Sequence, residues 1–153
     1  MATTISSLLK SKQKNLGNTA ITIEPVRTVY EALELMQKEN VGALAVVQQD
    51  GQLVGIFSER DYARKVGVKD LPVKTTLIEE VMTPQAELIR TATTASAMNC
   101  AIILDEGHIR HLPVFDTQGN FAGILSVRDI LRAVINDQTL LLEEYISTLT
   151  NRS

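Results

Sequence analysis

The chain contains one segment twice, and this duplication constrains the fold more than any other feature. Residues 41–66 (VGALAVVQQDGQLVGIFSERDYARKV) align without a gap with residues 109–134 (IRHLPVFDTQGNFAGILSVRDILRAV). From position 42 of the first copy onward, ten of 25 aligned pairs are identical. The identities include a motif of glycine, two apolar residues, serine, any residue, arginine and aspartate, at 55–61 and 123–129. Self-similarity at a fixed offset predicts two copies of one structural unit.

Each copy predicts the element order β-α-β-β-α. The first helix is predicted at 28–40, where Thr28 and Glu31 form a capping box, and at 96–107, where Gly107 is a natural C-cap. The other predicted elements, given for both copies, are an initial extended segment (20–24 and 87–91), a two-stranded hairpin that turns at Gly51 or Gly119 (43–57 and 111–125), and a second helix that begins at Ser58 or Ser126.

A single unit of about 60 residues buries too little apolar surface to be stable alone. We therefore predict an α+β protein in which two β-α-β-β-α repeats pack as a pseudo-twofold pair, share one core and leave clefts between them. The last helix is predicted either to cover this core or to contact a partner subunit, since Leu142, Tyr145, Ile146 and Leu149 lie on one side of it. The predicted boundaries are an N-terminal helical segment (1–17), the first repeat (18–73), a linker (74–85), the second repeat (86–136) and the C-terminal helix (137–153).

The composition narrows the class of protein. With 44% hydrophobic and 22% charged residues, the chain is typical of soluble globular proteins. Its formal charge of −3 gives no general attraction to nucleic acid or to an anionic membrane. No apolar run approaches the roughly 18 residues that a membrane span needs, and nothing resembles a signal peptide. The single cysteine, Cys100, excludes an intramolecular disulfide and a cysteine-based zinc cage. We expect a cytoplasmic protein.

The repeated motif is preceded by VGALAVV in the first copy and by IRHLPV in the second. With these flanks the chain resembles a tandem pair of CBS domains, or Bateman module, over about residues 18–136. The resemblance implies a non-catalytic regulatory module that binds an adenosine-containing ligand such as AMP, ADP, ATP, NAD or S-adenosylmethionine. The ligand would lie in a cleft between paired units and act through their arrangement. A homodimer and a regulated protein of unknown identity are also implied.

Within this resemblance, the second motif is expected to form the stronger nucleotide site. Asp129 is suited to accept hydrogen bonds from both ribose hydroxyls. Ser126 presents its hydroxyl, and the N–H groups of the helix start, toward negative charge. The predicted phosphate donors are Arg110, His111 and Arg128. The base is expected to meet Ile124 and, as the resemblance implies, five residues of the opposite repeat: Thr19, Ile21, Val41, Gly42 and Ala43.

The first motif predicts a second, weaker cleft. At two positions where the other cleft has basic side chains, this one has Gly42 and Ala43, so it offers fewer phosphate donors. It should bind a nucleotide less tightly or take a less charged ligand. Its predicted residues are Ile56, Ser58, Arg60, Asp61, Ile89 and Ile109.

Each of these residues also has a purely structural alternative. The two motif serines are natural N-caps, and the two motif aspartates are first-turn acids that the helix dipole favours. Arg60 and Arg128 fit solvated surface positions, and many CBS domains carry a small or polar residue at the position of Arg128. The sequence leaves these alternatives open.

Two other functional classes remain as alternatives. A small nucleotide-processing enzyme would need a base–nucleophile pair, and the sequence contains neither a phosphate-binding glycine loop nor a serine elbow. A nucleic-acid-binding protein is disfavoured by the acidic balance and by the low content of aromatic residues, 4%. His108 and His111, with Asp105 and Glu106 nearby, form only a weak metal-binding pattern, so no metal is expected.

Overall fold

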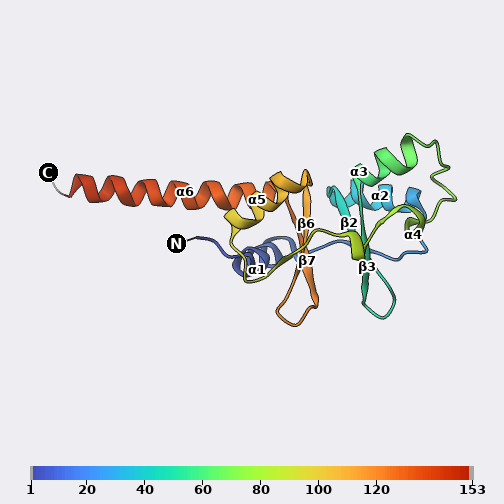
Figure 1. Ribbon diagram of the computed structural model, residues 1–153, viewed down its shortest axis with the longest axis horizontal. Helices are drawn as coiled ribbons and strands as arrows, with labels where there is room; N and C mark the ends of the chain where they lie inside the picture. Colours follow the sequence, from blue (N-terminus) through green and yellow to red (C-terminus); the bar gives the residue numbers. More distant parts are fainter. Residues whose placement is uncertain (1, 152–153) are drawn as a thin grey trace. The chain divides into compact units, whose positions relative to one another are not determined.

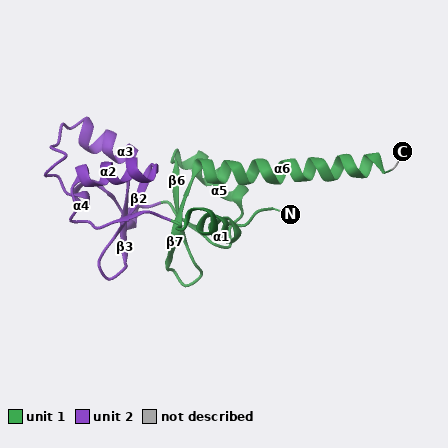
Figure 2. Cartoon of the chain, turned by 180° about the vertical axis from the view of Figure 1, so that it is seen from behind, with its two compact units in different colours: residues 1–19, 89–153 green, residues 20–88 purple. Residues whose placement is uncertain are grey.

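The two repeats form separate sheets, each with its own helices. The structure, a computed structural model, describes residues 2–151. Contacts divide the chain into one unit of residues 20–88 and another of residues 1–19 and 89–153 (Figure 2). The predicted α+β class is confirmed. Met1 and residues 152–153, which the predicted end segments include, lie outside the described residues.

The unit of residues 20–88 contains a four-stranded sheet in the order β1-β2-β3-β4 (Figure 1). β1 is parallel to β2, whereas β2 with β3 and β3 with β4 are antiparallel. In chain order its elements are β1 (Thr22–Ile23), α2 (Val29–Glu39), β2 (Ala43–Val47), β3 (Leu53–Ser58), α3 (Glu59–Asp61), a π-helical turn (Tyr62–Gly67), α4 (Ile78–Val81), β4 (Thr83–Pro84) and a 3-10 turn (Gln85–Glu87).

The other unit contains a three-stranded sheet in the order β5-β6-β7. β5 is parallel to β6, and β6 is antiparallel to β7, as in the first three strands of the other sheet. Its elements are α1 (Ile5–Leu16), β5 (Thr91–Ala92), α5 (Ala97–Gly107), β6 (His111–Phe115), β7 (Phe121–Ser126) and α6 (Val127–Thr150). The predicted order β-α-β-β-α is therefore present in both units.

The same local chemistry builds the hairpin in each unit. β2 and β3 pair Ala43 with Ser58, and β6 and β7 pair His111 with Ser126 in the equivalent register. A glycine at each hairpin tip has a φ of 88° or 83°, a left-handed conformation that other residues adopt at a cost. The register therefore places each motif serine at the end of the second strand, where a helix starts.

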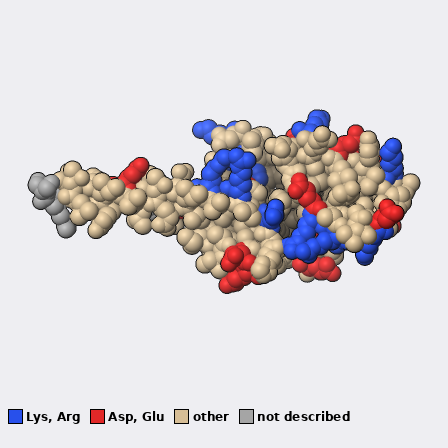
Figure 3. Space-filling model, turned by 90° about the horizontal axis from the view of Figure 1, so that it is seen from above, with Lys and Arg blue, Asp and Glu red and all other residues tan. Residues whose placement is uncertain are grey.

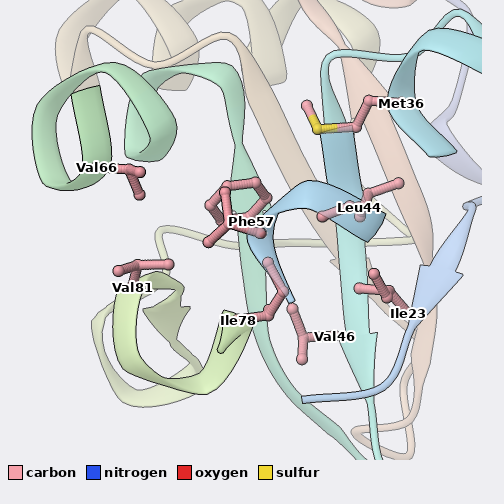
Figure 4. Close-up of a cluster of buried hydrophobic side chains, with 10 residues drawn as sticks. Ile23, Met36, Leu44, Val46, Phe57, Val66, Ile78 and Val81 are labelled. Carbon is pink, nitrogen blue, oxygen red and sulfur yellow. The ribbon is translucent and has the colours of Figure 1, made fainter. Parts of the chain in front are cut away.

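Each unit has its own apolar core. In the 20–88 unit, Phe57 of β3 lies among Val66 and Val81 of the helical segments and the side chains of the neighbouring strands (Figure 4). In the other unit, α1 adds the buried residues Ile5 and Leu9 to a core formed by the second repeat. The N-terminal helix is thus part of the unit that contains the second motif.

Two helix predictions need correction. α5 does end at Gly107, but the left-handed C-cap is the next residue, His108, with a φ of 51°. The C-terminal helix is not a separate element that begins at 137, because α6 runs from Val127 to Thr150 and contains no glycine or proline that would break it. Its last part is exposed from residue 138 onward and does not cover the core.

The segment predicted as a linker, 74–85, is also structured, since it holds α4 and β4. The boundaries of the two repeats stay a prediction. Among residues 2–151, no helix combines the length and the apolar content that a bilayer crossing requires.

Candidate functional site

Both motif serines cap the helix that follows them. Ser58 Oγ accepts a hydrogen bond from the N–H of Asp61 at 3.3 Å, and Ser126 Oγ accepts one from the N–H of Asp129 at 3.1 Å. In return, each aspartate accepts a bond from the N–H of its serine, at 3.0 and 2.9 Å. The capping alternative is therefore confirmed at both motifs. A ligand would have to use the acceptor capacity that the caps leave.

The carboxylate of Asp61 has contacts on both oxygens. Oδ2 accepts bonds from the N–H and the hydroxyl of Ser58, at 3.0 and 3.2 Å. Oδ1 accepts a bond from Thr83 Oγ1 at 2.8 Å and forms an ion pair with Lys65 Nζ at 3.0 Å. The side chain is only 10% exposed. These contacts connect the start of α3 to β4, so the main role of Asp61 in this unit is structural.

The carboxylate of Asp129 is more open. Hydrogen bonds from the N–H of Ser126 at 2.9 Å and from Lys12 Nζ at 3.1 Å both end on Oδ2. Lys12 lies on α1 and also donates to the carbonyl oxygen of Ile124 at 2.8 Å. The side chain of Asp129 is 26% exposed, compared with 10% for Asp61. Of the two motif carboxylates, Asp129 is the more accessible to ligand hydroxyls.

The surroundings of Asp129 keep it ionised. Partial burial pushes the pKa of this carboxyl upward, but the Ser126 N–H bond and the charge and hydrogen bond of Lys12 outweigh burial, so the pKa lies below its ordinary value. The folded state therefore favours the ionised form. This contribution to stability is present above the unfolded pKa of about 3.9 and is lost as the pH falls through the folded-state pKa.

Replacing Lys12 with methionine should raise the pKa of Asp129, because the Ser126 bonds alone then oppose desolvation. The ionised carboxylate should in turn contribute less stability, so that the free energy of unfolding falls less steeply as the pH is lowered toward the acid range. An NMR titration of the Asp129 carboxyl carbon measures the shift. Lys14→Met is the matched control, since Lys14 is exposed on the same helix. An unchanged Asp129 pKa in Lys12→Met would contradict the assignment.

The segments before the two repeats take equivalent places beside the central hairpins. Thr83 in β4 pairs with Ile56 of β3. The carbonyl oxygen of Thr19 accepts a hydrogen bond from the N–H of Ile124 in β7 at 2.9 Å. The contact is close, because a Cβ atom on Gly123 would lie 2.7 Å from the Cβ of Thr19. Thr19, predicted from the resemblance, thus lies directly against the strand that leads into the second motif.

The residues predicted to bind phosphate surround the turn between β7 and α6. The carbonyl oxygen of Arg110 accepts a bond from the N–H of Val127 at 2.8 Å, and His111 pairs with Ser126 across the hairpin. Arg110 and Arg128 are exposed. The backbone therefore brings the three predicted phosphate donors to the same end of the hairpin as the motif serine. Their contact with phosphate stays a prediction.

Three of the predicted apolar residues belong to the unit that contains the second motif. Ile124 in β7 is 4% exposed and belongs to the same unit as Asp129. Ile89 and Ile109 both lie close to Gly107 at the end of α5, where a Cβ atom on Gly107 would be 3.0 Å from Ile89 and 3.5 Å from Ile109. Both isoleucines belong to the unit of the second motif. They were predicted to line the cleft of the first motif, and this part of the site stays a prediction.

The remaining predicted residues lie around the first hairpin. The carbonyl oxygen of Gly42 accepts a bond from the N–H of Glu59 at 3.0 Å, the counterpart of the bond that Arg110 accepts in the other unit. The carbonyl oxygen of Ile21 accepts a bond from the N–H of Ala45 at 2.9 Å. All of the predicted residues in this group belong to the 20–88 unit, and their part in a ligand site stays a prediction: Ile21, Val41, Gly42, Ala43, Ile56 and Arg60.

Three residues that contact the motif carboxylates were not predicted. Lys65 is four residues after Asp61 on a helical segment, a spacing that is visible in the sequence. Thr83 precedes the second repeat. Its place is equivalent to that of Thr19, a predicted residue, before the first repeat. Lys12 is 117 residues from its partner, so no local pattern points to it.

Cys100 is fully buried in α5, as its apolar surroundings predict. Burial raises the pKa of its thiol, and the contact of its Sγ with Thr91 Oγ1 at 3.5 Å offsets this only in part. A thiol with these properties is a poor nucleophile. In the described part of the chain, no three His, Cys, Asp or Glu side chains are grouped so that they could hold a metal ion.

The fold and the sequence both match known proteins. The profile of the CBS domain family matches residues 16–67 and 78–136. The CBS domain-containing protein CBSX3, mitochondrial, of Arabidopsis thaliana is 36% identical over 138 residues, which cover 89% of this chain and 66% of that protein. The chain thus spans just under two thirds of the length of this relative.

Solved structures show the same fold. A protein with CBS domains from Burkholderia ambifaria matches with a TM-score of 0.77 at 37% identity, over 89% of this chain and 96% of that one. A CBS domain protein from Pyrobaculum aerophilum, solved complexed with AMP, matches in fold with a TM-score of 0.68 at 24% identity, over 82% and 88% of the two chains. With two profile matches on repeats that fold into equivalent hairpins and capped helices, the chain belongs to the CBS domain family, as a regulatory module with two copies of the domain.

Proposed function

We propose that the protein senses adenine nucleotides without catalysis and that Asp129 binds the ribose. The carboxylate of Asp129 carries this proposal: it is favoured in its ionised form, is 26% exposed and accepts its bonds from Ser126 and Lys12 on one oxygen. An ionised carboxylate has about four acceptor positions, so it retains capacity for the two ribose hydroxyls. Acidic residues bind ribose in this way in dinucleotide sites.

Positive charge near Asp129 supports a ligand with phosphate groups. The Lys12 ammonium neutralises the carboxylate, which would otherwise repel an anion. The exposed Arg110 and Arg128 stand on the two segments that meet at this turn. The N-terminus of α6 adds a partial positive charge from the helix dipole. These features favour AMP, ADP, ATP or NAD over an uncharged nucleoside.

The ligand is proposed to act by favouring one arrangement of the two repeats. It can shift that equilibrium only by the difference between its affinities for the two arrangements. A protein of similar fold, from Pyrobaculum aerophilum, was solved complexed with AMP, so AMP is the first ligand to test. The regulated protein would then recognise the ligand-bound arrangement.

Calorimetric titration with AMP tests the proposal. The unmodified protein should bind AMP, and AMP should raise its melting temperature by mass action. Asp129→Ala should weaken binding by about tenfold to a hundredfold, since a hydrogen bond to a charged group contributes about 1.5–3 kcal/mol. Asp61→Ala should weaken binding much less, because both oxygens of Asp61 already have partners within its unit.

Two results would contradict the proposal. If AMP, ADP, ATP and NAD all fail to bind the unmodified protein, nucleotide sensing is wrong. If Asp129→Ala and Asp61→Ala weaken AMP binding equally, the assignment of the stronger site to Asp129 is wrong. Circular dichroism on both variants separates loss of binding from loss of the fold.

A further inference from the structure

Lys12 contacts the proposed ribose carboxylate from outside the repeat that carries it. Its ammonium donates to Asp129 Oδ2 at 3.1 Å and to the carbonyl oxygen of Ile124 at 2.8 Å. The profile of the CBS domain family matches residues 16–67 and 78–136, so Lys12 lies before the first matched residue. This contact is therefore not part of the repeated motif.

The packing of α1 fixes the position of Lys12. Ile5 and Leu9 of this helix are buried in the core of the unit. Lys12 follows Leu9 by three residues, so it lies on the same side of the helix. The N–H of Ile5 donates to the carbonyl oxygen of Ala95 at 2.9 Å and anchors the start of α1. The side chain of Lys12 is only 18% exposed, so its charge is held in one place beside Asp129.

The first repeat supplies an equivalent ammonium from its own sequence. Lys65, four residues after Asp61, forms an ion pair with Asp61 Oδ1 at 3.0 Å. At the offset of 68 that relates the two copies, the residue aligned with Lys65 is Ala133, which is uncharged and 9% exposed. The second motif has no lysine of its own at this position, and Lys12 takes its place from α1.

The two ammonium groups leave different parts of their carboxylates accessible. On Asp61, Lys65 contacts Oδ1, which also accepts the bond from the Thr83 hydroxyl. On Asp129, Lys12 contacts Oδ2, the oxygen that already accepts the N–H of the motif serine. An ammonium has three N–H donors, and two of those of Lys12 have acceptors in the unit. Lys12 can therefore stay in place, and offer its third donor, while a ligand binds.

The other basic side chains near the second motif are exposed. Arg110 and Arg128 flank the turn between β7 and α6. Residues 133–151 include no Lys or Arg, and the projecting part of α6 shows no basic atoms on the face seen in Figure 3. An exposed charge on a flexible side chain is screened by water and salt. A mostly buried charge that two hydrogen bonds hold in place acts more strongly on a nearby anion.

We propose that Lys12 is a specificity-determining residue of the Asp129 site, and that it selects ligands with a phosphate group over uncharged nucleosides. This inference rests on the proposed function, in which Asp129 binds the ribose. The ammonium and the carboxylate are together neutral, so a phosphate attached to the ribose meets no net repulsion. Without Lys12, the phosphate would face the negative carboxylate alone.

Calorimetric titration of the full chain with AMP and with adenosine tests this role. A unit charge about 6 Å away in water changes affinity about threefold for each charge of an anion, so Lys12→Met should weaken binding of the doubly charged AMP about tenfold. Adenosine has no phosphate, so its affinity should change little. Lys12→Arg keeps the charge and should keep the preference for AMP. Lys14→Met is the matched control: it removes one positive charge from an exposed position of the same helix and should change neither affinity.

Equal losses of AMP and adenosine affinity in Lys12→Met would overturn the inference, because Lys12 would then only maintain the shape of the site. An undiminished preference for AMP in this variant would overturn it as well. In both cases, a loss of AMP binding in Asp129→Ala would still support the proposed function. If neither ligand binds the unmodified protein, the proposed function is wrong and the inference with it. Circular dichroism checks the fold of each variant, and Lys12→Gln, neutral but still a donor, gives the same test if methionine disturbs the fold.

Discussion

Gly55→Ala should destabilise the 20–88 unit by about 3 kcal/mol, at the upper end of what overpacking costs. A Cβ atom at this position would lie 2.5 Å from the carbonyl oxygen of Thr83 and 2.8 Å from Sδ of Met82. The oxygen is part of the backbone of β4, which pairs with Gly55 and its neighbour, so relief of the clash requires movement of the whole strand. That movement would also draw Thr83 Oγ1 away from Asp61, its acceptor at 2.8 Å.

Urea denaturation monitored by circular dichroism measures this loss. Gly67→Ala is the control in the same unit. A Cβ atom on Gly67 would have the Tyr62 carbonyl oxygen as its nearest neighbour, at 3.6 Å, which is an ordinary contact. Because Gly67 ends a helical turn, alanine should leave the stability unchanged or raise it by about 0.5 kcal/mol. Equal losses of stability in Gly55→Ala and Gly67→Ala would contradict the prediction that the close packing of β4 against Gly55 is the cause of the loss.

Local and repeated features of the fold were predictable from the sequence. The offset alignment predicts two equivalent hairpins, and the structure pairs Ala43 with Ser58 as it pairs His111 with Ser126. The motif serines and aspartates predict capping boxes, because serine three residues before an acid satisfies the free N–H groups of a helix start. Each of these features depends on residues that are close in sequence or on a comparison of the two copies.

Features that depend on distant partners were not predictable in the same way. Lys12 reaches Asp129 because α1 packs into the core beside the second repeat, a contact across 117 residues. Its position in a polar N-terminal segment gives no sign of this. The end of the second repeat was predicted at 136 because the motif pattern stops there, whereas the helix continues for lack of a breaking residue. The candidate ligand residues from the opposite repeat rest on family resemblance.

The two motif aspartates should also differ in what they contribute to stability, in the order opposite to their proposed roles in binding. Asp61→Ala should destabilise the 20–88 unit by about 3 kcal/mol, because it leaves the Ser58 N–H and the Thr83 hydroxyl without their acceptor and leaves the Lys65 ammonium with only the Met82 carbonyl oxygen, at 3.3 Å. Lys65 is 36% exposed and can turn toward water, so this partner adds the least.

Asp129→Ala should cost only about 1 kcal/mol, the typical loss when a helix cap is removed. Its carboxylate is 26% exposed, and its bonds come from Ser126 and from Lys12, which keeps the Ile124 carbonyl oxygen as a second acceptor. Chemical denaturation of the two variants beside their AMP titrations separates the roles. A greater loss of stability in Asp129→Ala than in Asp61→Ala would mean that the open carboxylate also holds the fold. A smaller loss, together with the greater loss of AMP affinity, would mean that the duplicated motif has one copy committed to structure and one available to a ligand.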